Sequence, residues 1–576
     1  MTRETGSAQT SRATRLASLA NETFDVLVLG GGIGAACAAW DASLRGLKVA
    51  LVERLDFGAG TSAHSFKVLH GGIRYLQHLD LPRLRESCHE RGSFLRIAPH
   101  LMQQLPVAVP TFGYGIQSRW VLASAFAVLE LLTFDRNRGL SDRARTIPAP
   151  YLLSRSELLQ RFPGLPREGL TGAGVFYDGQ IRNPPRAVLA IVQAAMDAGA
   201  VAANYCEADR LIVRNGAVCG AEVRDVLGNE RFAVRAAVTV NAAGPYALDF
   251  LRRSEQSVRA NVPFSRDMAI VIPRQLDPEL AVAVQTRYAD PDAVLSRGNR
   301  HLFMAPWRNR YTLIGVNSRV YTGSPYELKV TEPEVAEFVA EINEAYPGLQ
   351  LKLEDVAAVN AGLLPFGENT QGAKDLSFGK RSVVIDHAQS DGLQGLVTGM
   401  SIRWTMGRLL GRHVTDLAEG KVRGGVSASR TDRTPVRGGD IVSLAAVEKD
   451  LRAAAPQLST TQVSRIASNY GADWNAVVGP QQSERQVIVG SDYLISELQH
   501  AVHHEYAATL TDVVLRRLDL GSGERPSEAT LAACADLVAS ELGWSATRRA
   551  SELQRVRASY PFAGPESQYP VSVADP

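Results

Sequence analysis

The clearest pattern of apolar and polar residues lies near the N-terminus. Val26–Leu29 is a short apolar run, and an apolar pattern with helical spacing covers Ile33–Leu44. Arg45-Gly46 interrupts that spacing, and Val49–Val52 is a second short apolar run. Short apolar runs of this kind are typical of buried strands, so the pattern predicts a strand–helix–strand unit at the start of the chain.

The C-terminal part of the chain has a helical pattern. After Val442, apolar residues recur at helical spacing, and His500 and His504 lie one turn apart on the same predicted helix. One apolar stripe consists of Leu498, Val502, Tyr506, Leu510 and Val513. Two histidines at this spacing are also typical of metal sites, but no third ligand is evident, so a polar helix face is the preferred interpretation. The segment RTDRTPVRGGD, at 430–440, predicts a linker.

One apolar stretch is a candidate for contact with a membrane. Trp120–Phe134 is interrupted only by Ser124, Glu130 and Thr133. A membrane-spanning helix needs about 20 apolar residues, so this stretch is too short to cross a bilayer. We expect a buried core helix, and the alternative is a helix that contacts a membrane surface.

Composition narrows the class of protein. The chain has 576 residues, which predicts two or three domains, and its 62 basic and 60 acidic residues give no support to nucleic-acid binding. The five cysteines lack CxxC spacing, which argues against a disulfide framework and a structural zinc site. A cytoplasmic location fits this cysteine usage best. Residues 1–23 are rich in Ser, Thr, Ala and Arg and lack the apolar run of a secretory signal.

A glycine fingerprint lies between the first predicted strand and helix. Its G-x-G-x-x-A pattern consists of Gly30, Gly32 and Ala35, and Glu53 closes the second strand. Gly30 permits a tight turn, Gly32 lets the backbone approach a pyrophosphate, and the helix N-terminus attracts the negative charge. A carboxylate in the position of Glu53 suits a ribose diol. The pattern predicts dinucleotide binding, and by itself it leaves FAD and NAD open.

The segment SFKVLHGGIRYLQ, Ser65–Gln77, combines reactive side chains with glycines. Two adjacent glycines allow the backbone to press against a flat ring. His70 can exchange a proton near neutral pH, and Arg74 offers a bidentate fork for a phosphate or carboxylate. Further along the chain, the strand in AAVTVNAAGPYA ends in small residues that let the backbone pass close to a ligand.

These blocks together resemble the FAD-dependent glycerol-3-phosphate dehydrogenases, within the D-amino-acid-oxidase-like flavoproteins. The resemblance runs from about Phe24 to about Leu520. The blocks that carry it are LGGGIGAA, GTSAHSFKVLHGGIRYL, RIAPHL, FYDGQI, VNAAGPYA, APWRNRYTLIGV and HAVHHEYAATLTDVVLRRLDLG. Their order and spacing over most of the chain make the resemblance specific.

The resemblance implies a fold class and a division of the chain. The fold is an α/β (α+β) two-domain flavoprotein: a Rossmann-like FAD-binding domain with an inserted antiparallel-sheet substrate domain, plus an all-helical C-terminal domain. The expected divisions are a disordered segment at 1–23, the FAD-binding domain with its interleaved substrate portion at 24–429, a linker at 430–441, the helical domain at 442–530, and a helical extension with the tail at 531–576.

The resemblance also implies which residues form the site. Those expected in catalysis are His70, Arg74, Tyr75, Arg403 and Thr405. Those expected to bind FAD are Gly30, Gly31, Gly32, Ile33, Gly34, Glu53, Arg54, Thr61, Ser62, Lys67, Leu69, His70, Ala208, Ala243, Gly244, Ser401 and Ile402. No metal is expected.

The implied reaction is oxidation of a secondary alcohol by hydride transfer to flavin N5, while a base removes the hydroxyl proton. The substrate implied is sn-glycerol 3-phosphate, the product dihydroxyacetone phosphate, and the electron acceptor a quinone or another acceptor. A homodimer and a peripheral contact with the cytoplasmic membrane are further expectations, and nucleic acid is not an expected partner.

Three departures from the family lie in the expected pocket. Ala269 stands where the family has a His, and Leu364 stands where it has an Arg that grips the phosphate. Arg403 aligns with the family's Lys only with a two-residue insertion, and the ungapped alternative puts Ser401 there. A paralogue that oxidises a different hydroxy or polyol-phosphate compound is therefore an alternative. A flavin-binding protein without turnover, and an amino-acid or amine oxidase, are others.

Overall fold

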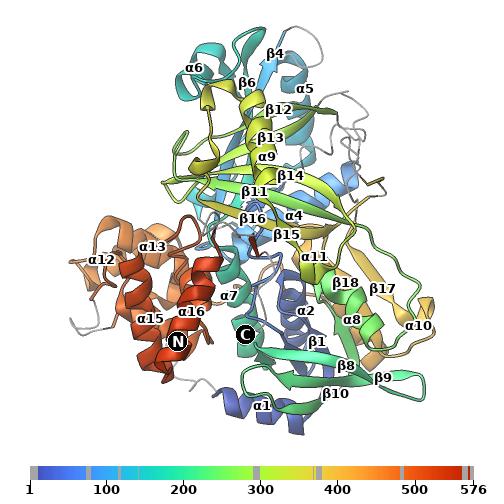
Figure 1. Cartoon of the computed structure of the whole chain (residues 1–576). Coiled ribbons are helices and arrows are strands. Elements are labelled where there is room, and N and C mark those ends of the chain that lie inside the picture. Colours follow the sequence, from blue (N-terminus) through green and yellow to red (C-terminus); the bar gives the residue numbers. More distant parts are fainter. Residues whose placement is uncertain are drawn as a thin grey trace.

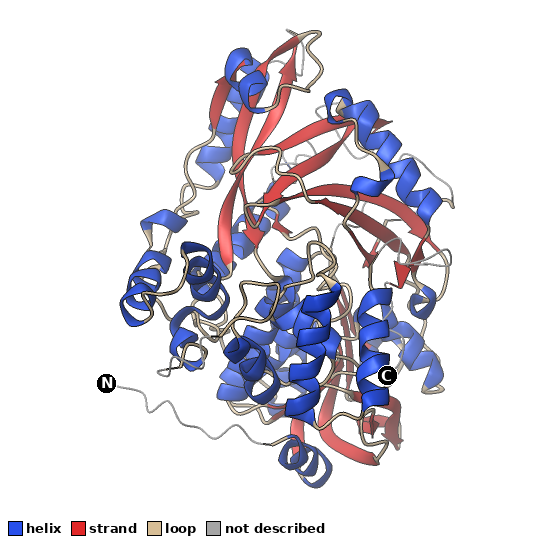
Figure 2. Cartoon of the chain, turned by 60° about the vertical axis from the view of Figure 1, so that its left-hand side comes forward, coloured by secondary structure: helices blue, strands red, loops and turns tan. Residues whose placement is uncertain are grey.

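The computed structural model describes most of the chain. The described residues are 11–72, 75, 80–113, 119–140, 142–289, 299–367, 369–371, 379, 381–479, 486–560 and 569–570. They form two large sheets and a group of C-terminal helices, and these three parts lie side by side (Figures 1 and 2).

An eight-stranded sheet forms the lower half of the molecule in Figure 1. Its elements are β1 (Thr23–Leu29), α2 (Ile33–Leu44), β2 (Val49–Val52), α7 (Pro184–Asp197), β7 (Val201–Ala203), β8 (Cys206–Arg214), β9 (Ala217–Asp225), β10 (Arg231–Asn241), α8 (Ala247–Arg253), β17 (Val383–Asp386), α10 (His387–Ser390), β18 (Leu396–Met400) and α11 (Gly407–Arg423). The strand order is β17-β18-β10-β1-β2-β7, with the hairpin β8–β9 attached to β10. Helices α2, α7 and α11 share a core with one face, and α8 packs on the other. The predicted strand–helix–strand unit is β1-α2-β2.

A nine-stranded, mainly antiparallel sheet forms the upper half. Its nine strands are β3 (Val68–Leu69), β4 (Met102–Phe112), β5 (Tyr151–Ser154), β6 (Leu170–Ile181), β11 (Phe264–Ile272), β12 (Ala281–Ala289), β13 (Asn299–Trp307), β14 (Tyr311–Tyr321) and β16 (Ala358–Pro365). The helices between them are α4 (Leu81–Ile97), α5 (Arg119–Leu132), α6 (Arg155–Arg161) and α9 (Glu332–Ala345), and the short strand β15 (Lys329–Val330) lies outside this sheet. The order is β16-β11-β14-β13-β12-β4-β6-β3, and α9 covers one face with an apolar core. Because these strands come from several separate stretches of chain, the sheet is inserted into the first domain, as predicted.

Helices form the C-terminal part of the chain. They are α12 (Leu444–Ala454), α13 (Thr460–Tyr470), α14 (Ile495–His504), a π-helix (Asp512–Arg517), α15 (Glu528–Leu542) and α16 (Ala546–Ala558), and β19 (Tyr569–Pro570) pairs with β15. The predicted fold class is therefore confirmed. The predicted boundary at residue 530 is wrong, because it falls inside α15, which shares one core with α14 and α16. The other predicted boundaries stay predictions.

The N-terminal segment contains a helix that the sequence analysis did not predict. Helix α1 (Arg12–Asn21) begins after Ser11, whose hydroxyl accepts a hydrogen bond from the Thr14 backbone N–H. The Arg12 guanidinium pairs with Asp225 at 2.6 Å, and Leu19 is fully buried. The expectation of disorder at 1–23 is therefore wrong for this helix, because an ion pair and an apolar anchor fix it to the first sheet.

Helix α5 is not the buried core helix that we expected. Phe126 is buried, but Trp120 is 69% exposed, Leu131 75% and the following Phe134 79%. One side of α5 packs on β6, and the other side carries these large apolar groups outward. Among the described residues, no helix is long and apolar enough to cross a membrane.

A buried ionic network joins the C-terminal helices to the first sheet. The Asp56 carboxylate accepts hydrogen bonds at 2.7 Å from Arg516 and from Arg517, and all three side chains are buried. Burial alone would raise the pKa of Asp56, but the charges of Arg517 and Arg516 outweigh it and lower that pKa. Removing one partner from such a network leaves an uncompensated buried charge.

We expect Asp56→Ala to destabilise the protein by about 3–5 kcal/mol, because it leaves two buried guanidiniums without their shared carboxylate. Urea unfolding followed by circular dichroism measures this as a lower midpoint. The matched control is Asp135→Ala, which removes an exposed carboxylate paired with Arg85 at 2.7 Å and should cost less than about 1 kcal/mol. Equal midpoints for the two variants would contradict the role of the network.

Candidate functional site

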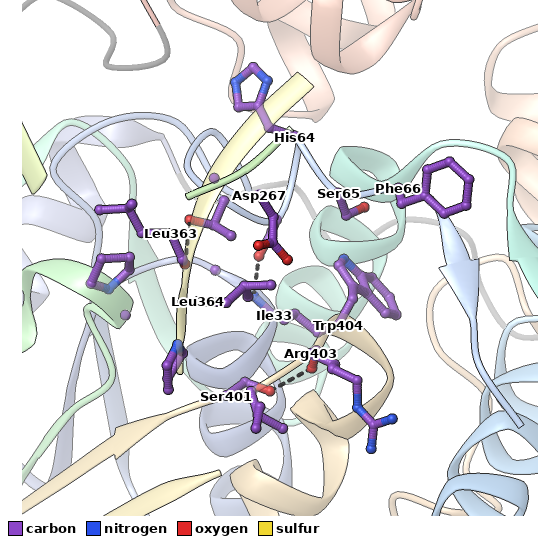
Figure 3. A pocket seen from close by; sticks show the side chains of 18 of the residues that line it. Ile33, His64, Ser65, Phe66, Asp267, Leu363, Leu364, Ser401, Arg403 and Trp404 are labelled. Atoms are coloured by element: carbon purple, nitrogen blue, oxygen red, sulfur yellow. Dashed lines mark hydrogen bonds between the residues drawn. The ribbon is translucent and has the colours of Figure 1, made fainter. Parts of the chain in front are cut away.

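A cavity of about 620 Å³ is lined by residues of both sheets (Figure 3). Its walls come from the β1–α2 turn, the end of β2, the segment that leads into β3, the ends of β10 and β16, and the connection from β18 to α11. This volume is within the range of roughly 300–1,000 Å³ that is typical of ligand sites.

The glycine turn between β1 and α2 lies at one end of the cavity and leaves open space beside its backbone. Gly30 has a φ of +105°, and a Cβ there would lie 2.7 Å from the Ala242 carbonyl oxygen, so the fold itself requires this glycine. Gly32 differs, since a Cβ there would meet only the Ser62 hydroxyl, at 3.2 Å. Ser62 accepts a hydrogen bond from the Ile33 backbone N–H, and α2 begins at that residue. The open space before a helix N-terminus fits a diphosphate.

Glu53 lies beside this turn, at the end of β2. Its Oε1 accepts a hydrogen bond of 2.7 Å from the Leu55 backbone N–H, and burial raises the pKa of its carboxyl. The neighbouring Arg54 guanidinium lies 5.2 Å from the ring of Tyr246 and 5.1 Å from that of Tyr326. All four residues line the cavity. A carboxyl for ribose hydroxyls and a stacked guanidinium fit the nucleoside end of a dinucleotide. The sequence analysis missed the two tyrosines.

His70 and Asp178 form a hydrogen-bonded pair at the cavity wall. The His70 Nδ1 lies 3.0 Å from Asp178 Oδ2, and the other carboxylate oxygen accepts a 2.6 Å hydrogen bond from the Gly71 backbone N–H. The Asp178 side chain is 3% exposed and that of His70 34%. Because the carboxylate occupies Nδ1, the Nε2 of His70 is the nitrogen left for a bound molecule.

Asp178 is a site residue that the sequence analysis missed. It comes from β6, and the pairing of β3 with β6 sets Leu69 opposite Gly179, so His70 and Asp178 become neighbours. The signal was present in the block FYDGQI, which contains Asp178, but only the strand register shows what it contacts.

Two guanidiniums gather on one ring at the cavity wall. The Tyr75 ring lies 4.7 Å from the Arg83 guanidinium and 5.2 Å from that of Arg403. Arg403 also donates a 3.3 Å hydrogen bond to the Ser87 hydroxyl. Nearby, the buried Thr405 hydroxyl has no hydrogen-bond partner among the described residues. The Nε of Arg83 donates a 2.5 Å hydrogen bond to Asp80, which offsets part of the charge of Arg83. We name Tyr75, Arg83 and Arg403 the cationic end of the cavity, and its two guanidiniums suit a phosphate or carboxylate.

Most of the predicted site residues line this one cavity. They are Gly30, Gly31, Gly32, Ile33, Gly34, Glu53, Arg54, Thr61, Ser62, His70, Tyr75, Ala208, Ala243, Gly244, Ser401, Ile402, Arg403 and Thr405. Arg74 lies outside the described residues. The structure brings the eighteen residues named above together in one cavity, and their roles toward cofactor and substrate stay predictions.

Two predicted cofactor residues lie behind the cavity wall. Alternation along β3 turns Val68 to the cavity, while Leu69 is fully buried in the core. The Lys67 ammonium lies 4.9 Å from the Trp307 ring, and burial, with the charge of Arg308, lowers its pKa to about 7. The side chains of Lys67 and Leu69 therefore do not line the cavity, and their contact with the cofactor stays a prediction.

Ala269 and Leu364, the departures noted in the sequence, both line the cavity. The antiparallel pairing of β11 with β16 sets Ser265 opposite Leu364 and Asp267 opposite Gly362. Figure 3 shows Asp267 and Leu364 close together on this wall. The wall therefore carries a carboxyl and apolar groups. In the described part of the chain, no three His, Cys, Asp or Glu side chains form a group suited to a metal ion.

Comparison with protein families matches almost the whole chain. Residues 25–417 match the FAD dependent oxidoreductase family, and residues 429–549 match the C-terminal domain of alpha-glycerophosphate oxidase. The first match contains the glycine turn, His70, Asp178 and Arg403, so the cavity lies inside the region that defines the family.

Known proteins agree with this assignment. A glycerol-3-phosphate dehydrogenase from Synechocystis sp. is 28% identical over 93% of this chain and 96% of its own length. The mitochondrial glycerol-3-phosphate dehydrogenase of Bos taurus is 31% identical over 95% of this chain and 74% of its own. The structure of the Bacillus halodurans enzyme complexed with FAD has the same fold, with a TM-score of 0.73, 22% identity and 98% of each chain covered. The chain thus belongs to the FAD-dependent oxidoreductase family and, within it, to the glycerol-3-phosphate dehydrogenase family that its sequence resembles, with FAD as its cofactor.

Proposed function

We propose that this protein oxidises the secondary alcohol of sn-glycerol 3-phosphate to the ketone of dihydroxyacetone phosphate. The observation that carries the proposal is the position of the His70–Asp178 pair, which lines the same cavity as the glycine turn and the cationic end. A proton acceptor, a place for the cofactor and a place for an anionic group are the three parts that this reaction needs.

FAD supplies the hydride acceptor for this reaction. The Nε2 of His70 takes the hydroxyl proton of the substrate, and Asp178 holds the imidazole in the tautomer that can do so. The guanidiniums of Arg83 and Arg403 bind the phosphate and so fix which carbon faces the flavin. Thr405, whose buried hydroxyl has no hydrogen-bond partner among the residues that the structure describes, is a further group that can orient the bound molecules.

Anaerobic addition of candidate substrates to the purified holoenzyme tests the proposal, because reduction removes the yellow colour of the flavin. We expect glycerol 3-phosphate to bleach it. Bleaching by other hydroxy compounds alone would favour a paralogue with a different substrate. Bleaching by amino acids alone would favour an amine oxidase, and no bleaching by any of these would favour a flavin-binding protein without turnover.

We further propose that the outer side of α5 contacts the cytoplasmic membrane and that a quinone accepts the electrons. Trp120, Leu131 and Phe134 are exposed there, whereas Leu122 and Ala125 of the same helix line the cavity. One helix thus joins an apolar surface to the wall of the cavity, which suits an acceptor that resides in a bilayer.

A homodimer, expected from the resemblance, is testable by light scattering.

We expect Leu131→Glu to weaken binding to lipid vesicles by at least about tenfold, since burial of one large apolar side chain contributes roughly 1.5–3 kcal/mol. Co-sedimentation of the holoenzyme with vesicles of bacterial lipid measures the change. The control is Val442→Glu, which places the same charge on another side chain that is 81% exposed. Equal vesicle binding by the two variants would argue against the α5 surface.

A further inference from the structure

The cavity has a second polar region, beyond Ala269. Asp267, Thr286, Asn317, Ser318 and Glu341 line it, and we name these five residues the acceptor lobe. They come from β11, β12, β14 and α9. No role in the reaction proposed above uses these residues, although they line the same cavity as His70.

An irregularity in the second sheet opens this lobe. The register of β11 with β14 shifts between Met268 and Ala269, so that Asp267 faces Ser318 and Ala269 faces Gly315. On the α9 side, Asn317 donates a 3.2 Å hydrogen bond to Glu341. With only a methyl group at position 269, nothing larger separates the lobe from the rest of the cavity at that position.

The hydroxyls of Ser318 and Ser265 hydrogen-bond the Asp267 carboxyl, but two buried oxygens in the lobe still lack a donor in the part of the chain that the structure describes. Asp267 Oδ1 and Asn317 Oδ1 are both buried without a partner among the described residues. Burial also raises the pKa of Asp267 and of Glu341. A buried acceptor without a donor is costly, so the lobe suits a molecule that brings donors. The Arg300 guanidinium also lines the cavity, and its charge opposes the effect of burial on the pKa of both carboxyls. A phosphate group offers mainly acceptor oxygens, so it cannot supply the donors that Asp267 Oδ1 and Asn317 Oδ1 lack.

We propose that the acceptor lobe binds the hydroxylated carbon chain that extends beyond the reacting carbinol, so that the substrate is a polyol monophosphate longer than glycerol phosphate. This inference rests on the proposed function and refines it. The phosphate lies at the cationic end, the carbinol at His70, and the additional hydroxyls donate to Asp267 and Asn317. The chemistry is unchanged: the carbinol carbon gives a hydride to FAD, its hydroxyl gives a proton to His70, and a ketone forms.

The test compares kcat/KM of the holoenzyme, with a dye as electron acceptor, for glycerol 3-phosphate and for four- and five-carbon polyol monophosphates. We expect the longer compounds to be favoured by at least about tenfold, as for a hydrogen bond to a charged group. Equal or better use of glycerol 3-phosphate overturns the inference and leaves the proposed function in place. If no phosphate ester bleaches the flavin, the proposed function itself fails.

Substitutions in the acceptor lobe test whether these residues cause the preference for longer polyol monophosphates. Asp267→Leu should lower the ratio of kcat/KM for the longer compounds over glycerol 3-phosphate by at least about tenfold, and Asp267→Asn, which keeps an acceptor oxygen, should retain most of it. Flavin content shows that each variant is folded. Glu341→Leu is the second variant, with Glu344→Leu, an exposed position on the same helix, as its matched control. An unchanged ratio in both Asp267→Leu and Glu341→Leu overturns the assignment.

Discussion

Replacing Gly32 with valine is expected to give a folded protein that is colourless, with affinity for FAD lowered by at least about 100-fold, or ~2.7 kcal/mol. The backbone at Gly32 has φ −79° and ψ −178°, an extended conformation that valine adopts readily. A Cβ there meets only the Ser62 hydroxyl, at 3.2 Å, and the added methyl groups extend into the space before the N-terminus of α2. The fold therefore tolerates the side chain, and the diphosphate of FAD does not.

Absorbance of the purified variant and a titration with FAD measure this effect, and circular dichroism shows whether the fold is intact. Gly425→Val is the matched control, because a Cβ there meets nothing within 4 Å and the residue is remote from the cavity wall. Gly30→Val is the contrasting variant, since it collides with the Ala242 carbonyl and should fail to fold. A yellow Gly32→Val protein with a full complement of FAD would show that the diphosphate lies elsewhere.

The glycine turn was predictable because every part of it is local in sequence. The run before it, the helix after it and Glu53 lie within about one strand–helix–strand unit. The His70–Asp178 pair was not predictable in this way. More than one hundred residues separate its members, and only the register of β3 on β6 brings them together.

The incorrect expectations have physical causes of the same kind. The composition of the N-terminal segment suggested disorder. In the structure Arg12 forms an ion pair with Asp225 and Leu19 is buried in a core, and the partners of both residues are distant in sequence. The apolar run at α5 suggested burial, but one side of that helix lacks a covering element among the described residues. The position of the Lys67 side chain was equally invisible in the sequence, because its contact with Trp307 depends on residues 240 positions apart.

Asp178→Asn is expected to lower kcat by about 10²–10⁴-fold, the contribution typical of general acid–base catalysis, with little change in flavin content. The Gly71 backbone N–H donates to one carboxylate oxygen, so an amide would keep its oxygen there and turn its NH₂ toward His70. The imidazole would then accept at Nδ1 and carry its proton on Nε2. In that tautomer His70 cannot take the hydroxyl proton of the substrate, although nothing has been removed from the cavity.

His70→Gln should lose as much activity as Asp178→Asn, and the double variant should be no slower than either, because the two residues act on one proton. Steady-state kinetics of the FAD-loaded variants measure kcat and KM separately, and KM should change little. His503→Gln is the control, since His503 pairs with Glu541 at 2.7 Å on the surface of the C-terminal helices. If Asp178→Asn kept full activity while His70→Gln lost it, the imidazole would act without its carboxylate. If both kept full activity, another group would take the proton, and the role of the pair would be structural.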